Sequence, residues 1–347
     1  MAVPALSVLA SGMVSGVGLS APASCAAIRA AIDNFQETRF MDNGGEWIVA
    51  SEVLLEQPWR GLTKQAKMLA MAISECLEQL PGVKPEQIPL LLCVAETKRP
   101  GRLQGLDAEL FKQLQDELRH TFDTEHSTII AHGRVAGAVA LLQARRLLVE
   151  NRVPVVLVAG VDSFLIGSTL ADFQERDRLQ TSINSNGFIP GEGAAAILVS
   201  LPLRHEEPQL LCRGLGFAVE AATIESELPL RGEGLSQAIK AALTEANCAM
   251  HDLDYRITDI AGEQYYFKEA SLALSRTLRQ RKEEFDIWHP ADCIGEVGAA
   301  IGPVMLTVLL AACRKGYTLS NHILCHCGSD DGKRAALVLS YQPVGRQ

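Results

Sequence analysis

Cysteine and histidine meet in one short stretch of the chain, Cys325-His326-Cys327, and His289 and Cys293 precede it. A thiolate beside an imidazole is a nucleophile, and the same two groups are the usual ligands of zinc. Adjacent residues of an extended segment point to opposite faces, so Cys-His-Cys places at most two side chains on one side. The candidates are a pair of Cys327 with His326 or His289, a zinc site, or thiols with a purely structural role. The structural role is the simplest, so we expect no metal and no other cofactor.

The remaining cysteines are spread along the chain, nine in all, and several lie inside apolar runs. Cys93 stands in LLLCVA and Cys313 in LLAACRK. Reduced, buried thiols have this distribution in cytosolic proteins, where disulfides are rare. We therefore expect free thiols and a cytoplasmic location.

Length and composition narrow the class of protein. The chain has 347 residues, a formal net charge of −9 and 48% apolar residues, which is typical of a folded globular protein of about two folding units. The acidic balance argues against a nucleic-acid surface. No run of 18 or more apolar residues, the length of a membrane span, occurs, and Met1–Ser20 lacks the basic start of a signal peptide. We expect neither nucleic acid nor a membrane as partner.

Short apolar runs alternate with longer segments of helical periodicity. This alternation predicts an α/β protein with a largely parallel sheet covered on both faces. The predicted strands are Ala5–Ala10, Ile88–Val94, Val153–Ala159, Ala194–Leu201, Gln209–Cys212, Thr318–Cys325 and Ala335–Tyr341, and the predicted helices are Ser24–Ile32, Leu62–Leu80, Leu106–His120, Val135–Val149, Gly234–Asn247 and Val297–Ala312.

Two of these helices, Val135–Val149 and Val297–Ala312, are apolar on nearly every side, which predicts that both are buried. Their openings match: Arg134-Val-Ala-Gly-Ala stands 162 residues before Glu296-Val-Gly-Ala-Ala. The match indicates an internal duplication. We predict two similar halves, residues 1–203 and 204–347, joined through the polar segment Pro202–Pro208.

The duplicated layout is that of the thiolase fold, and several stretches resemble β-ketoacyl synthases. Asn186–Leu198 (NGFIPGEGAAAIL) and Val155–Ser163 (VVLVAGVDS) are the most specific of them. Ser7–Gly18, Gly295–Gly302 and Cys325–Leu337 resemble the opening strand, the second histidine motif and the glycine-rich terminal loop of the family. The resemblance implies two similar α/β halves, packed as layered sheets around buried central helices.

Members of this family condense acyl units with a cysteine at the start of a buried helix, two histidines (or a histidine and an asparagine) and a lysine. The family motifs place the cysteine position on Arg134 and the second histidine on Glu296. They place the first histidine on Ala261 or Gly262 and the lysine near Ala291. Arginine stays protonated and is not a nucleophile. We therefore expect no catalytic residue of the ketosynthase type in this chain.

The resemblance also implies that Arg134 and Glu296 converge at one pocket. An arginine at a buried helix start is unfavourable alone, because the helix dipole has the same sign there. We expect an ion pair with Glu296 that plugs the former acyl site; the alternative is that both side chains point to solvent. The further residues expected near this pocket are His132, His289, Cys293, His326 and Cys327.

Three functions are consistent with the resemblance. The first is a non-catalytic ketosynthase-like protein that acts by binding, because short chains of this type resemble proteins that accompany bacterial type VI secretion effectors. The second is a partner subunit of an active ketosynthase, like the chain-length factors that lack the nucleophile. The third is an enzyme of altered chemistry that acts on an acyl thioester with Cys327, His326 or Glu296.

The partners expected from the resemblance are a second protein chain and, beyond it, a secreted effector or an acyl carrier protein. Family members pair through a strand that continues the sheet, so we expect a homodimer or a heterodimer with a related chain. The pairing strand is expected next to Val155–Ala159.

Overall fold

The computed structural model describes residues 3–203 and 208–343. Ten of its strands form one sheet in the order β10-β9-β11-β12-β8-β1-β7-β6-β4-β5, and β2 and β3 form a separate hairpin. The strands are β1 (Leu6–Ser15), β2 (Gln36–Met41), β3 (Trp47–Ala50), β4 (Leu90–Val94), β5 (Thr128–Ala131), β6 (Val156–Ser163), β7 (Glu192–Ser200), β8 (Gln209–Val219), β9 (Tyr255–Thr258), β10 (Ile287–Trp288), β11 (His322–Gly328) and β12 (Lys333–Gln342).

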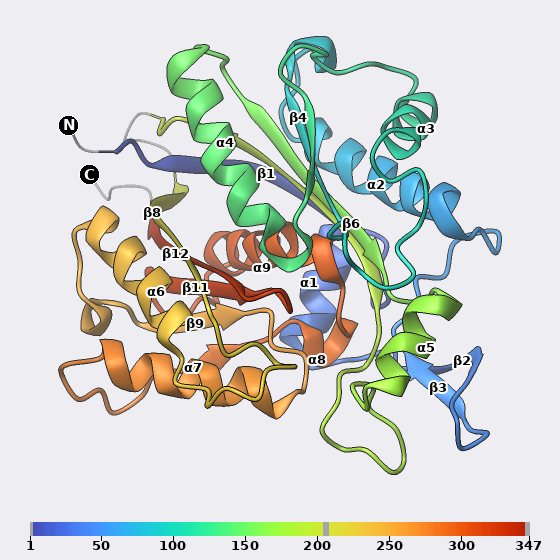
Figure 1. The fold of residues 1–347 in the computed structure, drawn as a ribbon. Helices are drawn as coiled ribbons and strands as arrows, with labels where there is room; N and C mark the ends of the chain where they lie inside the picture. Colours follow the sequence, from blue (N-terminus) through green and yellow to red (C-terminus); the bar gives the residue numbers. More distant parts are fainter. Residues whose placement is uncertain (1–2, 204–207, 344–347) are drawn as a thin grey trace.

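Helices join these strands and cover the sheet (Figure 1). They are α1 (Ala21–Arg29), α2 (Gly61–Glu78), α3 (Glu109–Leu118), α4 (Ala136–Glu150), α5 (Gly167–Glu175), α6 (Glu233–Ala246), α7 (Gln264–Thr277), α8 (Ala291–Ile294) and α9 (Ile301–Arg314). Four 3₁₀ turns complete the described elements: η1 (Pro85–Gln87), η2 (Gly133–Val135), η3 (Met250–Asp252) and η4 (Gly298–Ala300). No helix of the described ranges is both long and apolar enough to cross a membrane.

The strand order repeats in the two halves of the chain. Read outward from the centre, the first half runs β1-β7-β6-β4-β5 and the second runs β8-β12-β11-β9-β10. Neighbouring strands have the same relative direction at each step of the two series. The two series meet where β1 pairs antiparallel with β8, from Leu6↔Cys212 to Val8↔Leu210. The boundary predicted between residues 203 and 204, inside the segment Pro202–Pro208, falls at positions 204–207, which lie outside the described residues.

The prediction of a largely parallel sheet is wrong. Parallel pairing is confined to β6-β4-β5 and to β11-β9-β10, and the five pairs between them are antiparallel. The β11–β12 connection explains part of the difference, because a short turn at 329–332 can only return the chain antiparallel. A pattern of alternating strands and helices sets the order of elements but not the direction in which each strand enters the sheet.

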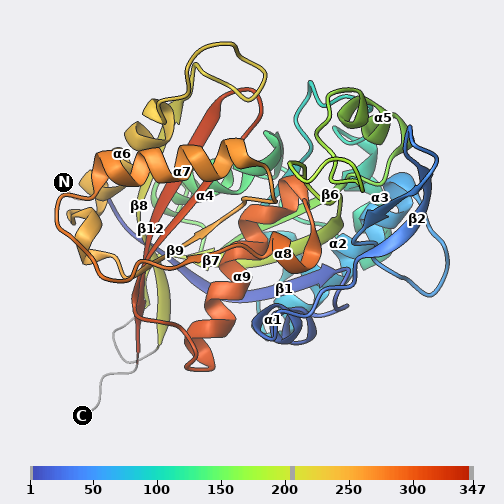
Figure 2. The same cartoon turned by 90° about the horizontal axis from the view of Figure 1, so that it is seen from below.

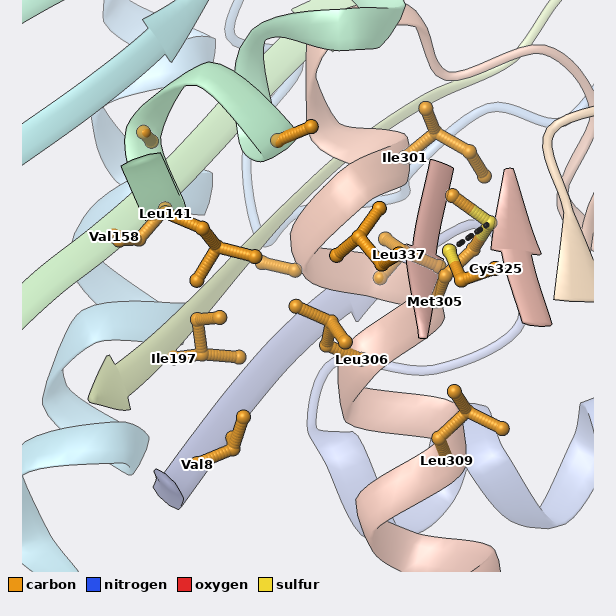
Figure 3. Packing of buried hydrophobic residues seen from close by; sticks show 14 of the residues in the cluster. Val8, Leu141, Val158, Ile197, Ile301, Met305, Leu306, Leu309, Cys325 and Leu337 are labelled. Atoms are coloured by element: carbon orange, nitrogen blue, oxygen red, sulfur yellow. Dashed lines mark hydrogen bonds between the residues drawn. The ribbon is translucent and has the colours of Figure 1, made fainter. Parts of the chain in front are cut away.

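Helices α4 and α9 form the middle layer of the molecule, and both predictions of buried helices are confirmed. The largest hydrophobic cluster joins them to inward-facing residues of both halves of the sheet. Figure 3 shows Met305 and Leu306 of α9 between Ile197 of β7 on one side and Cys325 and Leu337 of β11 and β12 on the other. Helices α2 and α3 cover the outer face of the first half, and α6 and α7 cover that of the second (Figures 1 and 2).

Every predicted strand and helix occurs with shifted ends, and the elements that the periodicity missed are short or polar. One expectation about the sheet is corrected. The strands next to β6 are β4 and β7, and each already pairs with neighbours on both sides. The free edge of the first half is β5 instead, which immediately precedes Arg134 along the chain.

Candidate functional site

Two glycine turns bring the starts of α4 and α9 together. Gly133 opens η2 with φ +53° and Gly298 opens η4 with φ +49°, a backbone region in which side chains are rarely tolerated. One turn further on, a Cβ on Gly137 would stand 2.9 Å from the Cα of Gly302, so the two helices cross backbone to backbone. This crossing places the two helix starts side by side (Figure 1).

The geometry shifts the expected correspondence between the two halves by three residues. Gly133 and Gly298 are 165 residues apart, and so are Gly137 and Gly302. Arg134 therefore corresponds to Ala299, and Glu296 precedes its turn by two residues. The runs of small residues in both openings allow either alignment, and only the backbone conformation separates them.

Arg134 and Glu296 nevertheless form the expected ion pair in the interior. Their side chains are 7% and 6% exposed, and Nη1 of Arg134 lies 3.4 Å from Oε2 of Glu296. Burial excludes the alternative in which both point to solvent. The nearer partner is a different carboxylate, because Nη2 of Arg134 lies 2.6 Å from Oδ1 of Asp330. Arg134 also donates to the hydroxyl of Tyr266 and stacks 4.4 Å from the centre of that ring.

A second arginine extends this network from the other side. Arg178 binds Glu263 through two parallel hydrogen bonds of 2.7 and 2.8 Å. Its Nη1 donates to Oδ2 of Asp330 at 2.6 Å. Asp330 thus lies between Arg134 and Arg178 and binds both, a fork geometry that makes strong and directional pairs.

A third arginine, Arg99, lies on the side of the hollow near β6. Arg99 binds Glu96 with hydrogen bonds of 2.9 and 2.7 Å, and its Nη1 lies 3.0 Å from Oδ2 of Asp162. Asp162 in turn accepts the backbone N–H of Ala299 at 2.9 Å. In the second half, Asp259 follows β9 and accepts the N–H of Gly328 at 2.9 Å. Three arginines therefore meet six carboxylates, which are Glu96, Asp162, Asp259, Glu263, Glu296 and Asp330.

The space left between these groups is about 10 Å³. A single water needs about 10–15 Å³, so the hollow holds one water and no substrate. Both expected residues, Arg134 and Glu296, line it. It is further lined by Glu96, Arg99, Phe164, Phe173, Arg178, Phe188, Ser329 and Asp330.

Burial and charge act in opposite directions on the carboxylates of this network. Burial raises the pKa of Glu296 to about 7, because the attraction to Arg134 only partly offsets it. Burial also raises the pKa of Asp162 and Asp259 above the ordinary range. Desolvation would likewise raise the pKa of Asp330, but Arg134 and Arg178 outweigh it and hold that pKa well below its usual value. Glu296 therefore takes up a proton near neutral pH, which reduces the excess of negative charge in the network.

The Cys-His-Cys motif lies inside β11, which extends past the predicted end of this strand at Cys325. Cys325 and Cys327 face the core with α9, where the Cys325 thiol lies 3.8 Å from the sulfur of Met305 (Figure 3). Alternation turns His326 to the opposite face, where Nδ1 lies 3.3 Å from the hydroxyl of Thr258. Burial raises the pKa of both thiols and lowers that of His326 to about 3, which favours neutral groups.

The remaining predicted residues are distributed over different surroundings. His132 precedes η2 and is half-buried, and burial lowers its pKa. His289 and Cys293 line a second cavity, bounded by α1, α8 and α9, instead of the hollow beside Arg134. Ala261 packs against the cluster around Phe164, and Ala291 begins α8. In the described ranges, no group of three or more His, Cys, Asp or Glu side chains is arranged to hold a metal ion.

Sequence reasoning missed Arg178, Tyr266 and Asp330, which supply the closest contacts around Arg134. One signal was available for Asp330. It follows β11, and Asp259 follows β9; these strands are parallel neighbours, so their carboxyl ends share one edge of the sheet. Arg178 and Tyr266 lie in polar segments whose place in space the chain pattern does not indicate.

Comparisons with known proteins agree with the fold. No family model matches the chain. The chain is 27% identical over 215 residues to a β-ketoacyl synthase 2 of actinorhodin polyketide synthesis from Streptomyces coelicolor, a match that covers 58% of this chain and 52% of that protein. It spans about half the length of the curated relatives it matches.

Solved ketosynthase structures match nearly the whole chain. A type II polyketide acyl-carrier protein in complex with its ketosynthase bound to the hexaketide aligns at a TM-score of 0.78 and 13% identity, over 97% of this chain and 99% of that one. The ishigamide ketosynthase/chain length factor aligns at a TM-score of 0.76 and 14% identity, over 98% and 99%. The chain has the thiolase-like fold of these ketosynthases, and part of its sequence is similar to β-ketoacyl synthases.

Proposed function

We propose that this chain is a non-catalytic ketosynthase-like subunit that acts by pairing with a related chain. The observation that carries the proposal is the filled hollow at the start of α4, where Arg134 occupies the space between Asp330, Tyr266 and Glu296. Acyl transfer needs a group that can attack the thioester and room for the substrate. A protonated guanidinium offers no electron pair, and about 10 Å³ admits only a water.

The edge strand β5 supports pairing as the mode of action. It pairs with β4 on one side and is the last strand of the sheet on the other, so its backbone groups on that side are available to another strand. Thr128 at its start is exposed and Ile129 is partly exposed. One structural neighbour is a ketosynthase/chain length factor, which fits a related chain as the partner. In this proposal, an acyl carrier protein binds to the complex of this chain with its related chain.

Co-purification tests the pairing. The tagged chain is expressed in its own cells at native level, and the captured proteins are identified by mass spectrometry. Native mass spectrometry then gives the mass, and therefore the stoichiometry, of the complex. We expect a 1:1 complex with a cysteine-bearing ketosynthase-like chain. Ile129→Lys on β5 should abolish the complex, since a charge at this edge blocks strand addition. Val149→Lys, the same kind of change at an exposed apolar site of α4, is the matched control and should leave the complex intact.

A chain that stays monomeric while its cysteine-bearing relatives are present overturns the pairing. The enzymatic alternative is tested separately, by incubation with acyl-CoA and acylated carrier protein followed by intact-mass analysis. We expect no covalent adduct and no loss of thioester. Burial of Cys327 and its raised pKa argue against that alternative, since the thiolate is the reactive form.

The adaptor role for a type VI secretion effector stays a prediction that rests on the sequence resemblance. The adaptor role and the pairing proposal predict that different proteins are captured in the co-purification experiment. Recovery of an effector or spike protein without any ketosynthase-like chain would favour the adaptor over the pairing proposal.

A further inference from the structure

A second cavity, of about 440 Å³, lies between α1, α8 and α9. Its volume is within the range of small-molecule sites, about 300–1,000 Å³. Its walls are mostly apolar: Cys25, Ile28, Trp288, Cys293, Val308 and Tyr317. Figures 1 and 2 both show α1 beside α8 and α9. The cavity shares no lining residue with the hollow beside Arg134, so a ligand site in this cavity is independent of the proposed function.

One cation with free donors stands at the mouth of this cavity. The guanidinium carbon of Arg29, at the end of α1, lies over the ring of Tyr317 at 4.3 Å from its centre. Among the described residues no carboxylate or carbonyl accepts a hydrogen bond from it. A guanidinium that contacts a ring through its face keeps its N–H groups for other partners, and it can bind a carboxylate with two hydrogen bonds.

His289 and Asp292, which also line the cavity, are paired with each other. The carboxylate of Asp33 lies near the cavity wall, where it helps to raise the pKa of the Cys293 thiol. Nδ1 of His289 lies 2.7 Å from Oδ2 of Asp292, and the imidazole packs edge-on against Phe267. Asp292 therefore does not neutralise Arg29. Within the described part of the chain, the cavity combines an apolar interior with one unpaired positive fork at its entrance.

Ala31, two residues after Arg29, lines the cavity and has a left-handed backbone conformation. Ala31 follows α1 with φ +52°, in the position of a helix end that glycine normally occupies. Its methyl group lines the cavity, and a glycine would remove both the strain and that contact.

The two thiols of the interior are packing groups and not reactive ones. Burial raises the pKa of Cys25 to about 12 and that of Cys293 to about 11. Both thiols are therefore protonated at neutral pH and present weakly polar, polarisable surface to a ligand. A ligand here binds without a covalent step.

We propose that the cavity between α1, α8 and α9 binds a small amphipathic carboxylate. Its apolar body lies against Trp288, Ile28 and Val308, and its carboxylate pairs with Arg29. An uncharged body of the same size gains the apolar contacts but not the ion pair. The charge and the apolar length of the ligand should therefore contribute separately to its affinity.

Binding of octanoate, hexanoate and octanamide tests this proposal. In the Trp47→Phe/Trp59→Phe protein, Trp288 is the only tryptophan left to report binding by fluorescence, and calorimetry gives the stoichiometry. We expect saturable 1:1 binding of octanoate, about tenfold tighter than hexanoate because two methylenes more are buried. Arg29→Gln should weaken octanoate about tenfold and leave octanamide unchanged.

Arg146→Gln, an exposed arginine of α4 outside the cavity, is the matched control and should bind octanoate like the unaltered protein. Absence of saturable binding up to millimolar octanoate overturns the proposal. So does equal octanoate affinity of Arg29→Gln and the unaltered protein. Neither result bears on pairing through β5, which the co-purification experiment measures independently.

Discussion

Replacing Glu296 by glutamine should remove a pH-dependent loss of stability that this residue causes. Glu296 is buried, accepts the N–H of Gly298 at 2.8 Å through one oxygen, and faces Arg134 at 3.4 Å with the other. Arg134 has its closest ion pair with Asp330 and not with Glu296. The attraction to Arg134 is therefore too weak to hold the pKa of Glu296 at its ordinary value.

The magnitude is set by the pKa of Glu296 in the folded chain, about 7 against an ordinary value of 4.5. Between these two values the folded protein holds one proton more than the unfolded chain. Stability consequently falls as the pH rises through this window. With about 1.4 kcal/mol for each tenfold step, ionisation of Glu296 costs the folded state about 3 kcal/mol above pH 7. Glutamine does not ionise, so the variant escapes this cost.

Urea unfolding of both proteins at pH 5, 6, 7 and 8, followed by tryptophan fluorescence, measures the effect. The variant should gain about 2.5 kcal/mol in free energy of unfolding relative to the unaltered protein between pH 5 and pH 8. Glu175→Gln, an exposed carboxylate at the end of α5, controls for the loss of one charge. A Glu296→Gln difference that stays constant within about 0.5 kcal/mol over this range refutes a raised pKa at Glu296 and the account of the network built on it.

Three other changes probe the same architecture. Arg134→Met should lower the free energy of unfolding by about 3–5 kcal/mol in urea titrations, because it removes one of the two cations that bind Asp330 and the cation that pairs with Glu296 and Asp259; a loss below about 1 kcal/mol contradicts the network. Iodoacetamide at pH 7.5 should label only Cys248 in the folded protein by peptide mass spectrometry, since the other eight thiols are buried and labelling of Cys327 would contradict their placement. Gly137→Val should prevent folding, seen as loss of soluble protein, because its Cβ would stand 2.9 Å from the Cα of Gly302; a soluble variant of normal melting temperature counts against the crossing.

Local sequence patterns were sufficient for the elements that the molecule buries. The apolar runs around α4 and α9 predict two internal helices, because a helix that is apolar all round has no face to offer to water. The repeat of their openings predicts two similar halves, and the strand order repeats accordingly. The sequence alone also shows that position 134 and its neighbours hold no cysteine, since none occurs between Cys93 and Cys212.

The direction of the strands was beyond the reach of these patterns. A buried strand such as β7 is apolar on both faces whichever way it runs, so its residues carry no record of its direction. The same holds for the offset between the halves, where small residues in both openings fit 162 or 165 positions equally well. Backbone dihedral angles at Gly133 and Gly298 decide between them.

The groups available to this protein were determined by the sequence alone: a guanidinium at position 134, a carboxylate at 296, nine thiols and two apolar helices. Which of these groups meet was decided only by the tertiary structure. Asp330 and Arg178 reach the network around Arg134 from distant parts of the chain, while His289 and Cys293 line a different cavity. The physical reason is that hydrophobic periodicity records burial against the nearest layer, whereas ion pairs form wherever the folded layers bring opposite charges within a few ångströms.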